Sequence, residues 1–216
     1  MLNTYSLWKK NRKLEGFVKP AAMVFLILGV ISFGVQLDAF PARMIFFIAA
    51  LFLCLLGDIF LFLPPEKYFQ KGLIAFLLGH VGYILGFGWG IDVRYQIIPI
   101  LVFFLLLAII NSQIAIKIIH ALRKSGRERL VIPIIVYSIT ISAMVFLAGL
   151  RYFDADWAVG DAYLVALGAL AFFISDVLNA WRRFVQKFSY DRIVIMGLYH
   201  LGQYAIGIGV IHHFVN

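Results

Sequence analysis

Two aspartates stand inside long apolar stretches of the sequence, where a carboxyl group is costly and marks either function or a buried partner. Asp58 precedes Pro64 by six residues, and Asp176 precedes the basic pair at 182–183 by the same number. At about 1.5 Å per residue, a helix would place each carboxyl group roughly 9 Å from its polar end. Two carboxyl groups at one depth are able to divide general acid and general base work between them.

Polar side chains on other apolar stretches fall at the same level. His80 and Tyr83, and likewise His200 and Gln203, are three residues apart, a spacing that puts each pair on one helix face. The other halves of the apolar stretches are almost purely aliphatic and aromatic. These observations predict a cavity that opens toward one leaflet and is lined by two carboxyl and two imidazole groups. The predicted binding or orienting residues are Lys19, His80, Tyr83, Asn111, Tyr137, Asn179, Tyr199, His200 and Gln203.

Membrane-spanning helices are the elements that carry these residues. The chain has 216 residues, of which 63% are hydrophobic and 14% charged, and its mean hydropathy is +0.94. A soluble domain is about 45–50% apolar and about 25% charged, and a membrane-crossing helix needs about 20 predominantly apolar residues. We predict a single all-α bundle behind a basic interfacial segment at 1–19, with seven transmembrane spans at 20–37, 42–63, 72–91, 96–116, 130–150, 162–180 and 193–215. The short break at 92–94 predicts a tight hairpin between the third and fourth spans.

Lysine and arginine are distributed unevenly between the two sides of this bundle. Of the 19 such residues, 16 lie on the side of the N-terminus and 3 on the other side. This asymmetry predicts a cytoplasmic N-terminus and a C-terminus outside. The net charge of +8 therefore indicates topology and contact with anionic lipid, not nucleic acid. We expect an integral multi-pass protein whose site faces the cytoplasmic leaflet, and the short loops favour a bacterial cell membrane.

Each polar residue also has a purely structural interpretation. An intramembrane aspartate can simply hydrogen-bond a neighbouring helix, histidines can be packing residues, and tyrosines can be interfacial aromatics. Gly82, Gly86 and Gly90 are spaced for close helix packing. The adjacent His212 and His213 make a poor chelate near the chain end, and no metal-binding spacing accompanies the other histidines, so no cofactor is predicted.

Five short motifs occur in an order that is typical of one family. They lie at residues 17–20, 55–64, 76–83, 168–176 and 199–203, and together they cover the chain from about Phe17 onward. In this ordered set the sequence resembles the YhhN-type lysoplasmalogenases, which are small multi-span membrane hydrolases. The resemblance implies hydrolysis of the vinyl ether bond of lysoplasmalogens, which releases a fatty aldehyde and glycerophosphoethanolamine or glycerophosphocholine.

The two aspartates suit this chemistry. Cleavage requires protonation of the vinyl ether β-carbon, and a carboxylate that stabilises the resulting cation and directs water, tasks that glycosidases divide between two carboxyl groups. We expect Asp58 and Asp176 to be the catalytic pair, one protonated and one ionised, although the sequence does not assign the two roles. Lys19, with Arg182 or Lys71, is expected to meet the phosphate. The expected partners are a lysophospholipid substrate and membrane lipid.

Three other classes of membrane protein compete with this interpretation. A transporter or flippase would use the same aspartates for coupling, but seven spans without an evident inverted repeat disfavour it. An intramembrane aspartyl protease would carry a G-x-G-D motif, in which Leu55 occupies the first glycine's place here. A zinc-dependent seven-span amidase would lose its activity to chelators.

Overall fold

Seven α-helices make up the computed structural model, which describes residues 12–37, 40–93 and 96–215. They are α2 (Arg12–Gln36), α3 (Met44–Phe62), α4 (Pro65–Gly88), α5 (Ile97–Lys124), α6 (Val131–Leu150), α7 (Val159–Phe184) and α8 (Asp191–Val215). Each contains a stretch long and apolar enough to cross a membrane, so the predicted all-α bundle of seven spans is confirmed. The predicted interfacial segment at 1–19 falls mostly outside the described residues, and its last part is the start of α2.

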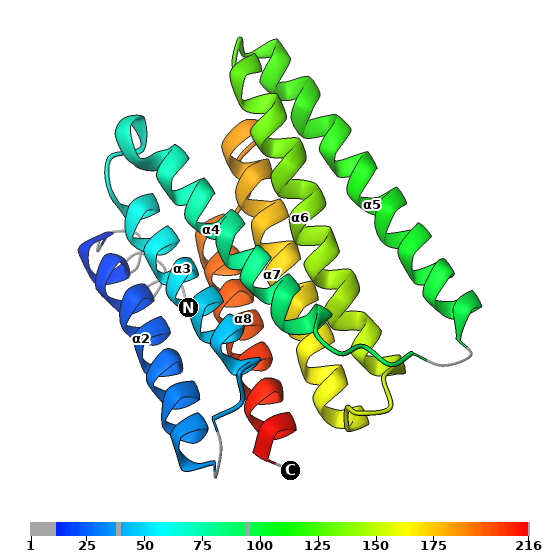
Figure 1. Ribbon diagram of the computed structural model, residues 1–216. Helices are drawn as coiled ribbons and strands as arrows, with labels where there is room; N and C mark the ends of the chain where they lie inside the picture. Colours follow the sequence, from blue (N-terminus) through cyan, green and yellow to red (C-terminus); the bar gives the residue numbers. More distant parts are fainter. Residues whose placement is uncertain (1–11, 38–39, 94–95, 216) are drawn as a thin grey trace.

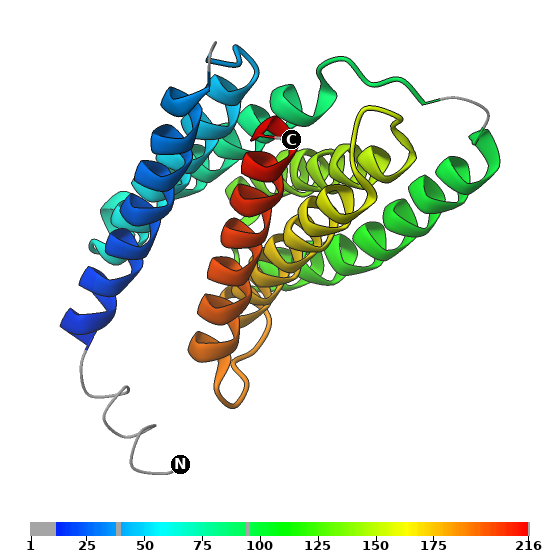
Figure 2. The same ribbon diagram turned by 90° about the horizontal axis from the view of Figure 1, so that it is seen from below.

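The helices alternate in direction along the chain. α2, α4, α6 and α8 begin at one end of the bundle, called here the site end, and α3, α5 and α7 begin at the opposite far end (Figure 1). The most extensive interfaces are those between α7 and α8 and between α3 and α4. Figure 2 shows α2 at one edge of the molecule and α5 at the opposite edge.

α4 and α5 do not form the tight hairpin predicted from the short break between them. The two helices scarcely touch, because α6 packs against both of them and separates them along the bundle (Figure 1). Only 6% of the apolar stretch of α5 is buried, so this helix presents most of its surface to lipid. A short connection between α4 and α5 therefore does not bring the two helices into contact, since both pack against α6 instead.

Close backbone approach explains the glycines of the two large interfaces. A Cβ atom on Gly202 of α8 would lie 2.7 Å from the Gly168 carbonyl oxygen of α7, a distance no real contact allows. On α4, a Cβ on Gly82 would lie 3.1 Å from the Phe46 carbonyl oxygen of α3. The predicted close packing thus holds for Gly82 and for Gly86, whose Cβ would lie 2.7 Å from the Phe47 ring, whereas Gly90 lies beyond the end of α4 with a φ of +62°.

Gly202→Ala is expected to lower the free energy of unfolding by about 1–3 kcal/mol, since overpacking forces backbone shifts. The added methyl group would meet the carbonyl of Gly168, which cannot rotate away as a side chain can. Denaturant or thermal unfolding of the purified protein in detergent measures the loss. Gly197→Ala is the matched control on the same helix, because its methyl group would meet nothing within 4 Å. Equal losses in the two variants would contradict this account of the α7–α8 interface.

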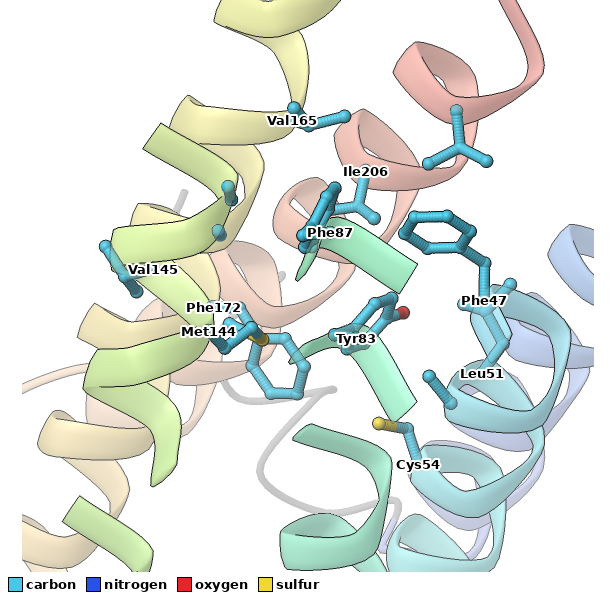
Figure 3. Close-up of a cluster of buried hydrophobic side chains, with 14 of the residues drawn as sticks. Phe47, Leu51, Cys54, Tyr83, Phe87, Met144, Val145, Val165, Phe172 and Ile206 are labelled. Carbon is cyan, nitrogen blue, oxygen red and sulfur yellow. The ribbon is translucent and has the colours of Figure 1, made fainter. Parts of the chain in front are cut away.

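The hydrophobic core fills the middle of the bundle where α3, α4, α6, α7 and α8 meet (Figure 3). Phe172 of α7 is fully buried there, beside Tyr83 and Met144. Its ring centroid lies 4.9 Å from that of His80 and 5.3 Å from that of Tyr199. The core therefore directly supports two of the predicted site residues.

Candidate active site

Asp176 is held by side chains from two other helices. The hydroxyl of Tyr137 on α6 donates a hydrogen bond to Asp176 Oδ2. Nε2 of His80 on α4 lies 3.2 Å from the same oxygen and 3.0 Å from the Tyr137 hydroxyl. The His80 side chain is completely buried, whereas that of Asp176 is 14% exposed. Tyr137 and His80 thus hold one oxygen of the Asp176 carboxyl group, and the partial exposure of the side chain leaves the group accessible from a cavity.

Asp58, on α3, has different surroundings. It is 7% exposed, and its buried Oδ2 atom has no hydrogen-bond partner. The Tyr199 side chain of α8 faces it as a hydrogen-bonding partner, and Lys19 of α2, His200 of α8 and the Asp176 carboxyl act on it electrostatically. The two carboxyl groups are therefore near neighbours with unlike hydrogen bonding.

A polar cavity of about 380 Å³ lies between the two aspartates and the site end of the bundle. Both carboxyl groups line it, together with the predicted residues Lys19, Asn179 and Tyr199. Its remaining lining residues are Pro20, Leu61, Phe62, Phe76, Ser175, Arg182, Arg183, Arg192 and Ile195. The structure thus brings two acids and four basic side chains to one cavity, an arrangement suited to acid–base chemistry beside a bound anion.

The basic side chains of this polar cavity differ in part from those expected. Arg182 lines it as predicted, and its Nε donates to Asp191 Oδ2 at 2.8 Å. Lys71 does not line it, because its ammonium group lies 5.2 Å from the ring centroid of Tyr68 instead. Arg183 and Arg192 were missed. Both could have been predicted from their positions, because they flank the loop between the last two spans and therefore lie next to the cavity mouth.

A second, apolar pocket lies on the other side of Asp176. Its polar lining residues include Asn111, Tyr137 and Asn179 of the predicted set. Asn111 accepts a hydrogen bond of 2.7 Å from the Ser138 hydroxyl, a contact between α5 and α6.

The prediction of a cavity lined by two imidazole groups is wrong. His80 lies behind Asp176 and His200 lies behind the wall of the polar cavity, and neither lines either cavity. His200 Nδ1 contacts the Met196 carbonyl oxygen at 2.9 Å, one helical turn back. Tyr83 donates a hydrogen bond to Gln203 within the core, where both are fully buried. Periodicity could not show which face of each helix points to the cavity.

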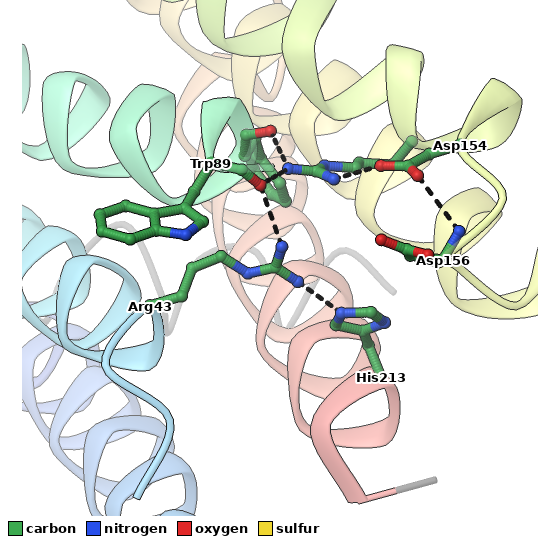
Figure 4. A network of polar contacts seen from close by, with 7 residues as sticks. Arg43, Trp89, Asp154, Asp156 and His213 are labelled. Atoms are coloured by element: carbon green, nitrogen blue, oxygen red, sulfur yellow. Dashed lines mark hydrogen bonds and ion pairs between the residues drawn. The ribbon is translucent and has the colours of Figure 1, made fainter. Parts of the chain in front are cut away.

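A buried polar network at the far end was also missed, because the other halves of the spans were expected to be almost purely apolar. Arg151 is fully buried, pairs with Asp154, and donates hydrogen bonds to the carbonyl oxygens of Phe87 and Trp89 at 2.5 and 2.6 Å (Figure 4). The guanidinium group thereby ties the end of α4 to the loop after α6.

Arg43 and His213 extend this network to α3 and α8. Arg43 donates to the Trp89 carbonyl oxygen at 3.1 Å and to His213 Nε2 (Figure 4). The imidazole ring of His213 stacks on Trp157 with 3.9 Å between ring centroids. Burial and the neighbouring Arg151 guanidinium group lower the pKa of Arg43 to about 10. His213 is thus a packed member of the network, not simply a residue at the chain end.

Within the described part of the chain, metal-ligating side chains do not gather at either end of the bundle. Among the residues described, no three side chains of histidine, cysteine, aspartate or glutamate lie together in a way that could hold a metal ion. His80 and Asp176 do meet, but the third member of their cluster is the Tyr137 hydroxyl.

These features define a class: an integral, multi-pass helical membrane protein with an acidic pair facing a basic cavity among its helices. The chain belongs to the YhhN family, whose family model matches residues 14–210. It is 27% identical to the lysoplasmalogenase TMEM86A of Homo sapiens over 193 residues, which are 89% of this chain and 75% of that protein. It is 26% identical to the lysoplasmalogenase TMEM86A of Bos taurus over 157 residues, 72% of this chain and 61% of that protein. No solved structure matches the chain.

Proposed function

We propose that this protein is a membrane hydrolase that cleaves the vinyl ether bond of lysoplasmalogens, the alkenyl lysophospholipids of ethanolamine or choline. The observation that carries the proposal is the presence of Asp58 and Asp176 on one cavity in unlike hydrogen-bonding surroundings. Its relatives in Homo sapiens and Bos taurus, which are named lysoplasmalogenases, support the same reaction. The products are a fatty aldehyde and glycerophosphoethanolamine or glycerophosphocholine.

The hydrogen bonds of the two carboxyl groups favour different protonation states. Asp176 accepts a hydrogen bond from Tyr137 and lies against His80 Nε2, and donors of this kind stabilise a carboxylate. The other ring nitrogen of His80 is buried without a partner, so Nε2 is the nitrogen that meets Asp176 and Tyr137. Asp58 lacks a hydrogen bond at its buried oxygen. We therefore assign Asp58 as the protonated acid and Asp176 as the ionised base.

Two proton exchanges return both groups to their starting state. Asp58 transfers its proton to the β-carbon of the vinyl ether, which leaves an oxocarbenium ion beside the Asp176 carboxylate. Water adds to the cationic carbon and gives one proton to Asp176, which produces a hemiacetal. Asp176 then protonates the glycerol oxygen as the carbon–oxygen bond breaks, and Asp58 takes the hydroxyl proton as the aldehyde forms. One water molecule is consumed in each cycle.

The basic side chains of the polar cavity suit the phosphate of the headgroup. Lys19, Arg182 and Arg192 lie on three different helix segments around one cavity, and guanidinium groups bind phosphate oxygens with directed hydrogen bonds. The scissile bond of a lysolipid lies close to its headgroup, at the depth of the two carboxyl groups. From the unequal distribution of lysine and arginine, we infer that this end of the bundle faces the cytoplasm.

Release of fatty aldehyde by the purified protein tests the proposal. The substrates are alkenyl lysophosphatidylethanolamine and alkenyl lysophosphatidylcholine, and the matched control is the alkyl ether lysolipid, which lacks the double bond. We expect aldehyde from the alkenyl lipids alone, with the same rate in the presence of EDTA. The proposal is wrong if the folded protein releases no aldehyde, and lipid flux in proteoliposomes would then be the next assay. Loss of activity with EDTA would instead overturn the metal-free acid–base mechanism.

A further inference from the structure

The apolar pocket beside Asp176 is the second cavity of the site. It encloses about 80 Å³ and is lined mainly by aliphatic and aromatic side chains of α4, α5, α6 and α7. Ile118 and Ile134 form part of its buried wall, and Phe69 and Phe184 pack against them. Its polar and charged lining residues include Asp176, Asn179 and Arg183, and the predominantly apolar remainder suits a hydrocarbon chain.

This pocket lies at the gap between α4 and α5, the neighbours in sequence that scarcely touch. Leu73 on α4 and Ile114 and Ala115 on α5 all line the pocket, and each is only half-buried. The remaining surface of α5 faces outward along nearly its whole length (Figure 2). Lipid surrounds the outer surface of a membrane-spanning bundle, so the side of the pocket between α4 and α5 faces the bilayer.

The apolar pocket and the polar cavity share one wall. Leu61, Phe76 and Asp176 line both, as do Asn179 and Arg183 at the site end. A molecule that occupies both cavities therefore has its charged part among the basic residues of the polar cavity. Its apolar part lies in the apolar pocket, among the side chains of α5. The junction between the two parts then lies beside the Asp176 carboxyl group.

We propose that the apolar pocket binds the first part of the substrate's single hydrocarbon chain, which enters sideways from the bilayer between α4 and α5. The proposal rests on the proposed function, to which it adds a chain-binding site and a route of access. The enclosed volume is only several times the roughly 10–15 Å³ that a cavity needs to hold one water molecule, so it takes the start of one chain and leaves the rest in lipid.

Ala115→Phe tests the site by filling the pocket from the α5 side. We expect binding of hexadecyl-lysophosphocholine, an alkyl ether lipid that is not hydrolysed, to weaken at least about tenfold. Turnover of a hexadecenyl lysolipid is expected to fall by the same factor, and that of a hexenyl analogue to fall as well, because both place the start of the chain in the pocket. Ala108→Phe is the matched control, because Ala108 is an exposed residue of the same helix and does not line the pocket. Unchanged binding and unchanged turnover in folded Ala115→Phe would overturn the proposal.

Photo-crosslinking of the unaltered protein removes any dependence on the folding of a variant. A hexadecyl-lysophosphocholine with a diazirine on a carbon near the ether is expected to label peptides of α4, α5, α6 and α7 that line the pocket. Labelling confined to other helices would contradict the assignment. These binding experiments also separate the two proposals. Binding that Ala115→Phe weakens, without aldehyde release by the unaltered protein, would retain the chain site and reject the hydrolase, whereas aldehyde release that Ala115→Phe leaves unchanged would do the reverse.

Discussion

Asp58→Asn and Asp176→Asn are each expected to lower the turnover of alkenyl lysolipid by at least about 100-fold, since positioned acid–base groups contribute about 10²–10⁴ in rate. Asparagine keeps the shape of the side chain and can still accept the Tyr137 hydrogen bond at position 176, but it neither delivers nor accepts the required proton. The effect should appear in kcat with little change in KM, because the lost interaction is made in the transition state. Aldehyde release as a function of substrate concentration measures both constants.

Asp156→Asn is the matched control for this pair. Asp156 is exposed at the far end of the bundle, where its backbone N–H donates to Asp154 (Figure 4). We expect this variant to retain its turnover, and we expect the double variant at 58 and 176 to lose little more than either single variant, as groups that act as a unit do. Near-normal turnover of a folded Asp58→Asn or Asp176→Asn protein would remove that residue from the mechanism.

Arg151→Met is expected to lower the free energy of unfolding by about 3–5 kcal/mol, because it leaves a buried carboxylate without its partner. Arg151 and Asp154 both have fully buried side chains, and the same guanidinium group satisfies the carbonyl oxygens of Phe87 and Trp89. Methionine fills a similar volume, so the loss reports the polar contacts more than a cavity. Unfolding of the protein in detergent, followed by temperature or denaturant, measures it.

The double variant Arg151→Met with Asp154→Leu separates the ion pair from the backbone hydrogen bonds. Removing both charges is expected to restore part of the lost stability, because no unpaired charge remains buried. The two carbonyl oxygens at the end of α4 still lack a donor, so the recovery stays incomplete. A loss below about 1 kcal/mol in Arg151→Met, the typical worth of an exposed ion pair, would show that the network contributes little to the fold.

Local composition was sufficient for the number and positions of the helices. A membrane span must be apolar over about 20 residues whatever its neighbours are, so each span can be recognised from its own residues. The same reasoning singled out Asp58 and Asp176, because an ionisable group in such a stretch stands out without knowledge of any contact. Both carboxyl groups do line one cavity, together with Lys19 and Tyr199.

Tertiary packing decided which side chains meet, and no local pattern contains that information. The pairing of α4 with α6 in place of α5 removed the predicted hairpin, and it brought Tyr137 to His80 and Asp176. Nothing in the local sequence around Arg151 indicates that it binds carbonyl oxygens some sixty residues earlier in the chain. Hydropathy is a property of one segment and determines where a helix lies in the membrane. The rotation of that helix and its choice of neighbours depend on how all seven surfaces fit together, and only the folded chain shows this.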